Sequence, residues 1–190
     1  DISKPIGNVI VDIGGGTTEV AVISLNGVVT KKAIKVAGDV MDHDIQNYFR
    51  NTHRLEIGDR TAEQIKITVG SAMRSRSKNI LVKGRDLVSG IPKTIDVRSD
   101  EIRQALKDSV KRILEVVKDA LESTPPELSS DIIDRGILVA GGGAQLRGLD
   151  QVIREKTNVP CNVVEEPHLA IVKGCGKIIE DLEKYKHVLI

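Results

Sequence analysis

The 190-residue sequence has few aromatic side chains and almost no excess charge. Aromatic residues make up 2% of it, with two tyrosines, one phenylalanine and no tryptophan. Sites for single-stranded nucleic acid usually stack bases on aromatic rings, so this scarcity nearly excludes such a platform. Lysine and arginine number 28 against 27 aspartates and glutamates, a formal net charge of +1. This balance argues against bulk affinity for nucleic acid, and we expect no nucleic-acid partner.

Cysteine, histidine and long apolar runs are also scarce. Cys161 and Cys175 have no C-x-x-C spacing, and the four histidines show no metal-ligand spacing. The cysteine count allows a disulfide, but we expect reduced thiols. There is no run of 18 apolar residues, no signal peptide and no lipidation motif. The chain begins with Asp1 rather than Met, which indicates a fragment or a trimmed chain.

Glycine, in contrast, is concentrated in two triplets. The first lies in Asp12–Thr18, Asp-Ile-Gly-Gly-Gly-Thr-Thr, between two strand patterns. Such a turn lets backbone N–H groups converge on an anion, usually a phosphate, with no Cβ in the way. Asp12 is placed to reach a phosphate-bound Mg²⁺ through water, and Thr17 and Thr18 offer hydroxyls to a phosphate oxygen or an attacking water. A plain glycine-rich hairpin turn with an aspartate at its corner fits the same local pattern.

Two common glycine motifs are excluded. No Gly-x-x-x-x-Gly-Lys-Ser/Thr sequence occurs in the chain. The segment Gly14–Gly16 leads into a strand pattern rather than a helix, so the dinucleotide-binding motif fails on context.

Periodicity predicts the elements of the first half. Strands are expected at 9–13, 19–25 and 28–36, with Asn26-Gly27 as a hairpin turn. A helix is expected at 41–52 with Asp39 as its N-cap, beside the glycine turn, where its N-terminus could add to anion binding. Thr61–Gln64 has capping-box spacing for a helix ending near Val69, and short strands follow at 80–83 and 93–97. Glu63 and Lys66 share one helix face, and on spacing alone they indicate an exposed ion pair.

The second half reads as helices alternating with strands. The longest helix starts at Ser99 and carries an apolar stripe: Ile102, Leu106, Val110, Ile113, Val117 and Leu121. A short helix (127–134) and a strand (136–140) lead into the second glycine triplet, Gly141–Gly143. That triplet is expected to open a helix at 144–156, bringing backbone close to a ligand. A strand at 160–165 and a helix at 169–184 follow. The small residues 174–176 of the last helix indicate either close approach of another backbone or ligand, or tight helix packing.

These elements predict an α/β fold with three antiparallel strands followed by β–α units and an insertion at about 41–96. That order is the topology of a ribonuclease-H-like lobe. We expect a mixed sheet flanked by helices, with a small α/β subdomain inserted.

The sequence resembles the MreB branch of the actin-like ATPase superfamily, the bacterial actins, over nearly its whole length. The likeness starts in the first glycine turn and recurs in order along the chain, in residues 36–39, 58–66, 84–95, 124–128, 134–137 and 140–144. The resemblance implies that this is the second large domain only. Subdomain IIA would comprise 1–40 and 97–190, subdomain IIB would comprise 41–96, and domain I would be absent.

The resemblance also implies a site for ATP or ADP with Mg²⁺. Asp12 would lie on the metal and water side, holding Mg²⁺ through water, and Thr17 near the attacking water; these two are the catalytic candidates. The other implied nucleotide contacts are Gly14, Gly15 and Gly16 at the β- and γ-phosphates, Gly38 beneath the ribose, Glu63 and Lys66 at the ribose and adenine, and Gly141, Gly142, Gly143 and Ala144 on the other side. Hydrolysis in such a site is mostly positioning and charge stabilisation, so no nucleophilic side chain is expected.

The implied function is that of a rod-shape-determining bacterial actin. Such a protein binds Mg-ATP in an interdomain cleft, hydrolyses it slowly and forms head-to-tail filaments with paired protofilaments. The filaments would be cytoplasmic and membrane-associated, guiding wall synthesis with cell-shape and wall-synthesis membrane proteins. The membrane contact would lie outside this fragment, which by itself is expected to be inactive. The alternatives are a sugar- or acetate-kinase-type phosphotransferase of the same superfamily and a non-hydrolysing interaction module.

Three departures from the family pattern are visible in the sequence. The first phosphate loop is missing. Val40 replaces a common acid, and the loop 73–79 is basic where relatives are often acidic. In the C-terminal region, His168-Leu169-Ala170 and Lys173 differ from the usual residues.

Overall fold

The computed structural model describes residues 3–74, 76, 78–183 and 185–186. Its larger sheet has the order β3-β2-β1-β7-β8. The strands are β1 (Asn8–Ile13), β2 (Thr18–Ser24), β3 (Gly27–Ile34), β7 (Ile137–Ala140) and β8 (Cys161–Val163). β1, β2 and β3 pair antiparallel, whereas β7 runs parallel to both β1 and β8. The predicted mixed α/β sheet is therefore confirmed.

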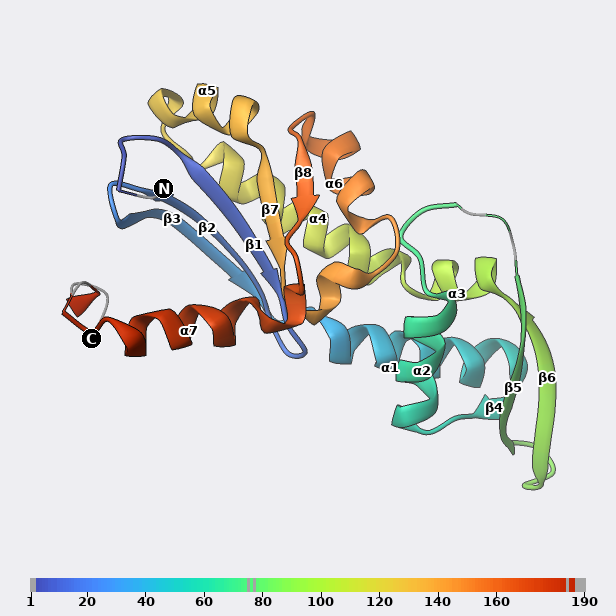
Figure 1. Cartoon of the computed structure of the whole chain (residues 1–190). Helices are drawn as coiled ribbons and strands as arrows, with labels where there is room; N and C mark the ends of the chain where they lie inside the picture. The colour runs from blue at the N-terminus through green and yellow to red at the C-terminus, as the bar shows by residue number, and fades with distance from the viewer. Residues whose placement is uncertain (1–2, 75, 77, 184, 187–190) are drawn as a thin grey trace.

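Alternation along the strands directs one face of this sheet toward helices. On β1, Val9, Val11 and Ile13 are buried, while the residues between them are partly exposed. Three helices lie against that side (Figure 1): α4 (Lys107–Glu122), α5 (Pro126–Arg135) and α6 (Leu149–Thr157). The aliphatic side chains between the layers form the core, as expected for a sequence so poor in aromatic residues.

A second, three-stranded sheet forms from strands that lie between β3 and β7 in the sequence. Its order is β4-β5-β6, all antiparallel, with bounds β4 (Leu55–Glu56), β5 (Asn79–Asp86) and β6 (Pro92–Arg98). The helices beside it are α1 (Gly38–Tyr48), which continues into a π-helix (Phe49–His53), α2 (Asp59–Val69) and α3 (Ser99–Ala105). The short β4 is missed by periodicity because two residues carry no detectable pattern.

Both α1 and α2 begin earlier than the sequence predicts. α1 begins at Gly38 with Ala37 as N-cap, and Asp39 makes no side-chain cap. The N–H groups of Gly38 and Asp39 donate instead to the carbonyls of Gly14 and Gly15, at 3.1 and 2.9 Å. α2 begins at Asp59 after Gly58, so the capping box expected from Thr61 does not form.

Turn and helix continuity also differ from expectation. The β2–β3 turn is centred on Leu25 and Asn26, both at positive φ, rather than on Asn26-Gly27. The predicted long helix is divided at Leu106 into α3 and α4, although i→i−4 hydrogen bonds continue across the junction. Its apolar stripe is buried as predicted from Ile102 to Val117, while Leu121 is only partly buried.

The second glycine triplet does not open an α-helix. Gly142 and Gly143 instead begin a 3₁₀ turn, Gly142–Gln145, and the chain reaches α6 only after Leu146 in extended geometry and Gly148 at φ +76°. The Met73 side chain lies over Gly148, where a Cβ would approach it to 3.0 Å. The expectation of an α-helix N-terminus at this ligand edge is wrong.

The last helix extends away from the small sheet (Figure 1). After a 3₁₀ turn (Pro167–Leu169), α7 spans Ala170–Glu180, and none of its residues is buried. Nothing lies within 4 Å of a Cβ built on Gly174 or Gly176, so the described residues include no partner for these small residues. The predicted helix end at residue 184 lies outside the described residues. No helix in the described ranges is long and apolar enough to cross a membrane.

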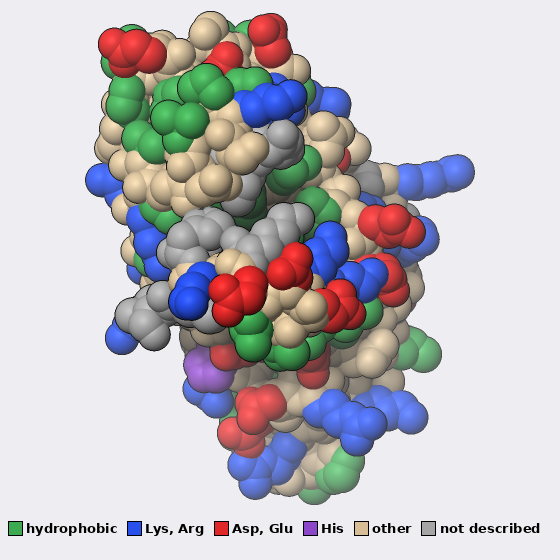
Figure 2. Space-filling model, turned by 60° about the vertical axis from the view of Figure 1, so that its left-hand side comes forward, with side chains coloured by type: hydrophobic (Ala, Val, Ile, Leu, Met, Phe, Trp, Pro, Cys, Tyr) green, Lys and Arg blue, Asp and Glu red, His purple; other side chains and the backbone are tan. Residues whose placement is uncertain are grey.

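Figure 2 shows basic and acidic side chains interspersed on the face that it presents. Neither sign forms a continuous field there. This distribution matches the nearly neutral formal charge of the sequence.

Candidate functional site

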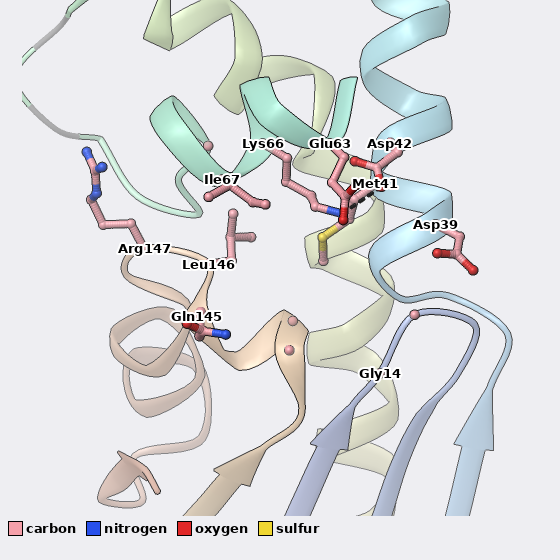
Figure 3. A pocket seen from close by; sticks show the side chains of 14 residues that line it. Gly14, Asp39, Met41, Asp42, Glu63, Lys66, Ile67, Gln145, Leu146 and Arg147 are labelled. Carbon is pink, nitrogen blue, oxygen red and sulfur yellow. Dashed lines mark hydrogen bonds and ion pairs between the residues drawn. The ribbon is translucent and has the colours of Figure 1, made fainter. Parts of the chain in front are cut away.

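A pocket of about 460 Å³ lies where the first glycine turn, α1, α2 and the segment after β7 meet (Figure 3). It forms at the carboxyl ends of the parallel strands β1 and β7, the usual ligand edge of an α/β sheet. The lining residues are Gly14, Gly15, Asp39, Met41, Asp42, Glu63, Lys66, Ile67, Gly70, Gly142, Gly143, Gln145, Leu146 and Arg147.

The first glycine turn presents free donors. Gly14 donates its N–H to the carbonyl of Thr17 at 3.0 Å, which closes the turn. The carbonyls of Gly14 and Gly15 accept from the start of α1, so their oxygens face the helix. Within the described residues, the N–H groups of Gly15, Gly16 and Thr17 have no hydrogen-bond acceptor. Consecutive unpaired N–H groups form an anion-binding concavity, so the turn fits a phosphate.

Asp12 lies beneath the second glycine triplet at the end of β1. Its Oδ1 is buried and has no hydrogen-bond partner among the described residues. Burial, together with the charge of Glu19, raises the pKa of Asp12 above its usual value. A carboxylate oxygen accepts only, so an orphaned one fits a donor or a cation. The residues present therefore fit Mg²⁺ reached through water. No cluster of three or more His, Cys, Asp or Glu suited to a metal occurs among the described residues.

The second triplet brings backbone against that carboxylate. Gly141 has φ +84°, and a Cβ there would lie 2.3 Å from the Ile13 carbonyl oxygen and 2.6 Å from Asp12 Oδ1. A Cβ on Gly143 would lie 2.3 Å from the Ile13 side chain, whereas one on Gly142 would meet none of the described residues within 4 Å. Gly141 and Gly143 are thus required by packing, and Gly142 is free to face the pocket.

Lys66 does not form the exposed ion pair with Glu63 that spacing indicates. Its ammonium reaches from α2 to α1, where Nζ lies 2.7 Å from Asp42 Oδ2 and donates to the Gly38 carbonyl at 2.9 Å (Figure 3). Burial raises the pKa of Asp42 despite the opposing effect of Lys66, and the charges of Glu63 and Asp39 add to the rise. Glu63 remains exposed at the pocket rim.

On the side of the pocket lined by Gly70 and Arg147, hydrogen bonds join two segments that are far apart in the sequence. Ala72 donates its N–H to the Arg147 carbonyl at 2.9 Å, and Ser71 Oγ donates to the same oxygen at 3.1 Å. The Arg147 guanidinium donates to the Thr68 carbonyl at 3.3 Å. These bonds tie the end of α2 to the loop before α6.

The structure brings the predicted residues to one edge but not all to the pocket surface. Six of them line it: Gly14, Gly15, Glu63, Lys66, Gly142 and Gly143. The others lie beside or beneath it: Asp12, Gly16, Thr17, Gly38, Gly141 and Ala144. Thr17 is exposed on the turn, whereas Ala144 is buried.

Sequence reasoning missed eight lining residues: Asp39, Met41, Asp42, Ile67, Gly70, Gln145, Leu146 and Arg147. Of these eight, only Asp42 could have been predicted from the sequence. Asp42 lies one helical turn after Gly38, on the helix that starts at the glycine turn. Gln145, Leu146 and Arg147 follow the second triplet with no pattern that indicates a ligand.

Comparison with known proteins decides the family. The model of the MreB/Mbl protein family matches residues 1–187. The chain belongs to the MreB/Mbl family. It is 49% identical over 185 residues to the cell shape-determining protein Mbl of Bacillus subtilis, covering 97% of this chain and 56% of that relative. The MreB/Mbl chain thus spans about half the length of the curated relatives that it matches.

Solved structures agree with this assignment. The crystal structure of MreB5 of Spiroplasma citri bound to AMPPNP superposes with a TM-score of 0.92 at 37% identity, covering 98% of this chain and 56% of that one. The MamK double helical filament superposes with a TM-score of 0.76 at 24% identity, covering 92% and 54%. The second likeness shows the fold alone.

Proposed function

We propose that this MreB/Mbl chain is the second large domain of a cell shape-determining bacterial actin. Residues 1–40 and 97–190 would form subdomain IIA and 41–96 subdomain IIB. The protein that contains it binds ATP or ADP with Mg²⁺ between two domains, hydrolyses ATP slowly and assembles head to tail into paired protofilaments. These filaments act in the cytoplasm at the membrane, with wall-synthesis membrane proteins as partners.

One observation carries the proposal: the unpaired N–H groups of the first glycine turn, the unpaired carboxylate oxygen of Asp12 and the ammonium of Lys66 lie at one edge of the pocket. The N–H groups of Gly15, Gly16 and Thr17 suit the polyphosphate, as does their position at the end of β1. The AMPPNP in the MreB5 structure supports a nucleotide as the occupant, because that protein shares this fold closely.

Each residue has a role that follows from its position. Bound Mg²⁺ would neutralise phosphate charge, and Asp12 would hold its water shell from beneath. Gly14, Gly15 and Gly16 would bind phosphate oxygens through the backbone, and Thr17 would orient a water by its exposed hydroxyl. Glu63 and Lys66 would face the nucleoside, above Gly38. Gly142 would bring backbone to the other side, supported by Gly141, Gly143 and Ala144.

The test is calorimetry with Mg-ATP on this chain and on a version extended with the N-terminal half of the Bacillus subtilis relative, with sedimentation alongside. We expect weak binding by the chain alone and tight, Mg-dependent binding with pelleting by the extended protein. A Cβ at Gly15 would lie 3.2 Å from Asp39 Oδ1, so Gly15→Val crowds the turn that carries the free N–H groups. Its affinity should fall at least about tenfold, because charge-assisted hydrogen bonds are worth about 1.5–3 kcal/mol each.

Gly58→Val is the matched control, because Gly58 has extended backbone geometry, open space around it and no place in the pocket. It should bind like the unsubstituted protein. An extended protein that binds ATP without assembling would favour the phosphotransferase alternative. An extended protein that binds no nucleotide would overturn the proposal.

A further inference from the structure

Asp42 occupies a position in the pocket that the proposed phosphate and metal contacts leave without a role. It lies on α1, and its carboxylate meets the ammonium of Lys66, which comes from α2. The Nζ–Oδ2 distance is 2.7 Å, and the two side chains are only 15% and 17% exposed. The pair is therefore a partly desolvated contact between two helices rather than a solvated surface pair, and its geometry is correspondingly restrained.

The Lys66 ammonium is also tied to the glycine turn through α1. Its second acceptor is the Gly38 carbonyl at 2.9 Å. The N–H of the same residue donates to the Gly14 carbonyl at 3.1 Å. Lys66 and Gly14 also pack closely around Gly38: a Cβ built on Gly38 would lie 3.4 Å from Lys66 Nζ and 3.4 Å from the Gly14 carbonyl oxygen. One short chain of hydrogen bonds thus connects Lys66 to the turn.

The donor count leaves one N–H for a ligand. An ammonium carries three N–H groups and no acceptor. Two of them point to Asp42 and Gly38, and the Lys66 side chain lines the pocket. Lysine has a flexible four-carbon stem, so without a fixed partner its ammonium samples many positions. Because two of the N–H groups are bonded to Asp42 and Gly38, the tetrahedral geometry of the ammonium fixes the direction of the third N–H.

We propose that Asp42 is a positioning residue, which holds the Lys66 ammonium so that its remaining N–H meets a bound nucleotide. This inference rests on the proposed nucleotide-binding function. Asp42 acts through Lys66, whose ammonium donates to its Oδ2. Its effect on affinity therefore depends on the presence of Lys66.

A double-mutant cycle tests this dependence in the extended protein, with the dissociation constant for Mg-ATP as the measurement. Asp42→Asn should weaken binding about ten- to hundredfold, in the range expected for a hydrogen bond to a charged group. Lys66→Met should weaken binding by a similar factor. The double variant should bind no more weakly than Lys66→Met, because Asp42 then has nothing to position.

The matched control is Asp44→Asn, on the same helix. The Asp44 carboxylate accepts a hydrogen bond from Ser109 on α4, away from the pocket lining. Asn can accept the same bond, so affinity should equal that of the unsubstituted protein. A loss in this control as large as that in Asp42→Asn would show a general effect of altering α1 and would overturn the inference.

A second readout needs no nucleotide. In protein labelled with ¹⁵N at the lysine Nζ, a held ammonium exchanges its protons slowly and gives a ¹H–¹⁵N signal, which is assigned by its loss in Lys66→Met. We expect this signal in the unsubstituted chain and in Asp44→Asn, and its broadening or loss in Asp42→Asn. Thermal unfolding of each variant checks that the fold is retained.

The outcomes separate this inference from the proposed function. Absence of nucleotide binding by the unsubstituted extended protein overturns the proposed function. Binding that is unaffected by Asp42→Asn overturns only the positioning role. An equal loss from Asp42→Asn in the presence and absence of Lys66 also overturns it, because Asp42 would then act independently.

Discussion

Replacing Gly141 by alanine is the sharpest test of the packing between the two glycine segments. Gly141 has φ +84° and ψ 163°, a backbone conformation that essentially only glycine adopts and that costs an L-residue about 1–3 kcal/mol. Its Cβ would also lie 2.3 Å from the Ile13 carbonyl oxygen and 2.6 Å from Asp12 Oδ1. The first of these contacts involves the backbone of a central strand, so β1 or β7 must shift, and overpacking of this kind costs about 1–3 kcal/mol.

Together the two terms predict a loss of about 2–6 kcal/mol in the free energy of unfolding. For a protein of this size, 3 kcal/mol corresponds to about 6–12 °C in the melting temperature. Urea denaturation followed by circular dichroism measures the loss directly. The shift should also displace the Asp12 carboxylate, which lies under the new methyl group.

Gly142→Ala is the matched control in the same triplet. In the part of the chain that the structure describes, no atom lies within 4 Å of a Cβ at Gly142, and the φ of Gly142 lies outside the left-handed region. Its stability should stay within about 0.5 kcal/mol of the unsubstituted protein. If Gly141→Ala were as stable as Gly142→Ala, the close approach of the two segments would be refuted.

Two further substitutions test the region around the small sheet. Phe49→Ala removes a fully buried ring that packs against Tyr48 and His53. It should lower the free energy of unfolding, measured by urea denaturation, by about 3–5 kcal/mol. Leu25 is exposed, so Leu25→Ala should change the free energy of unfolding by less than about 0.5 kcal/mol. Burial of Glu101 would raise its pKa, but hydrogen bonds from the Arg98 N–H, His53 and Tyr48 outweigh it and lower the pKa below the ordinary 4.5. A lowered carboxyl pKa gives stability that is present at neutral pH and is lost as pH falls through the folded-state pKa. Glu101→Gln should therefore cost about 1 kcal/mol at pH 7, and the difference should shrink below about pH 4.5; a difference that stays constant with pH would contradict this account.

Much of the fold is predictable because it depends on local patterns. The alternation in β1 and β2 reflects a sheet with one face against helices, and the apolar stripe of α3 and α4 reflects helical spacing. The two glycine triplets are visible in the sequence. Gly141 shows why glycine is needed there, because only glycine accepts its backbone geometry and its close contacts. The order of the elements followed from the same patterns, and the family resemblance is confirmed by the match over residues 1–187.

The errors arise where distant segments meet. Asp39 does not cap α1, because the first N–H groups of that helix donate to the glycine turn. The predicted helix after the second triplet is delayed, because the chain must pass under Met73 at Gly148. Neither contact leaves a trace in local sequence periodicity.

The sequence by itself determined the α/β class, the positions of the two glycine segments and the MreB-like order of strands and helices. These follow from short-range periodicity and from the backbone freedom of glycine. Only the tertiary structure decided that Lys66 pairs with Asp42 and that Asp12 Oδ1 is buried beneath Gly141. Those contacts join segments that are far apart in the chain, and side-chain charge and burial are fixed only when the sheet and helices pack together.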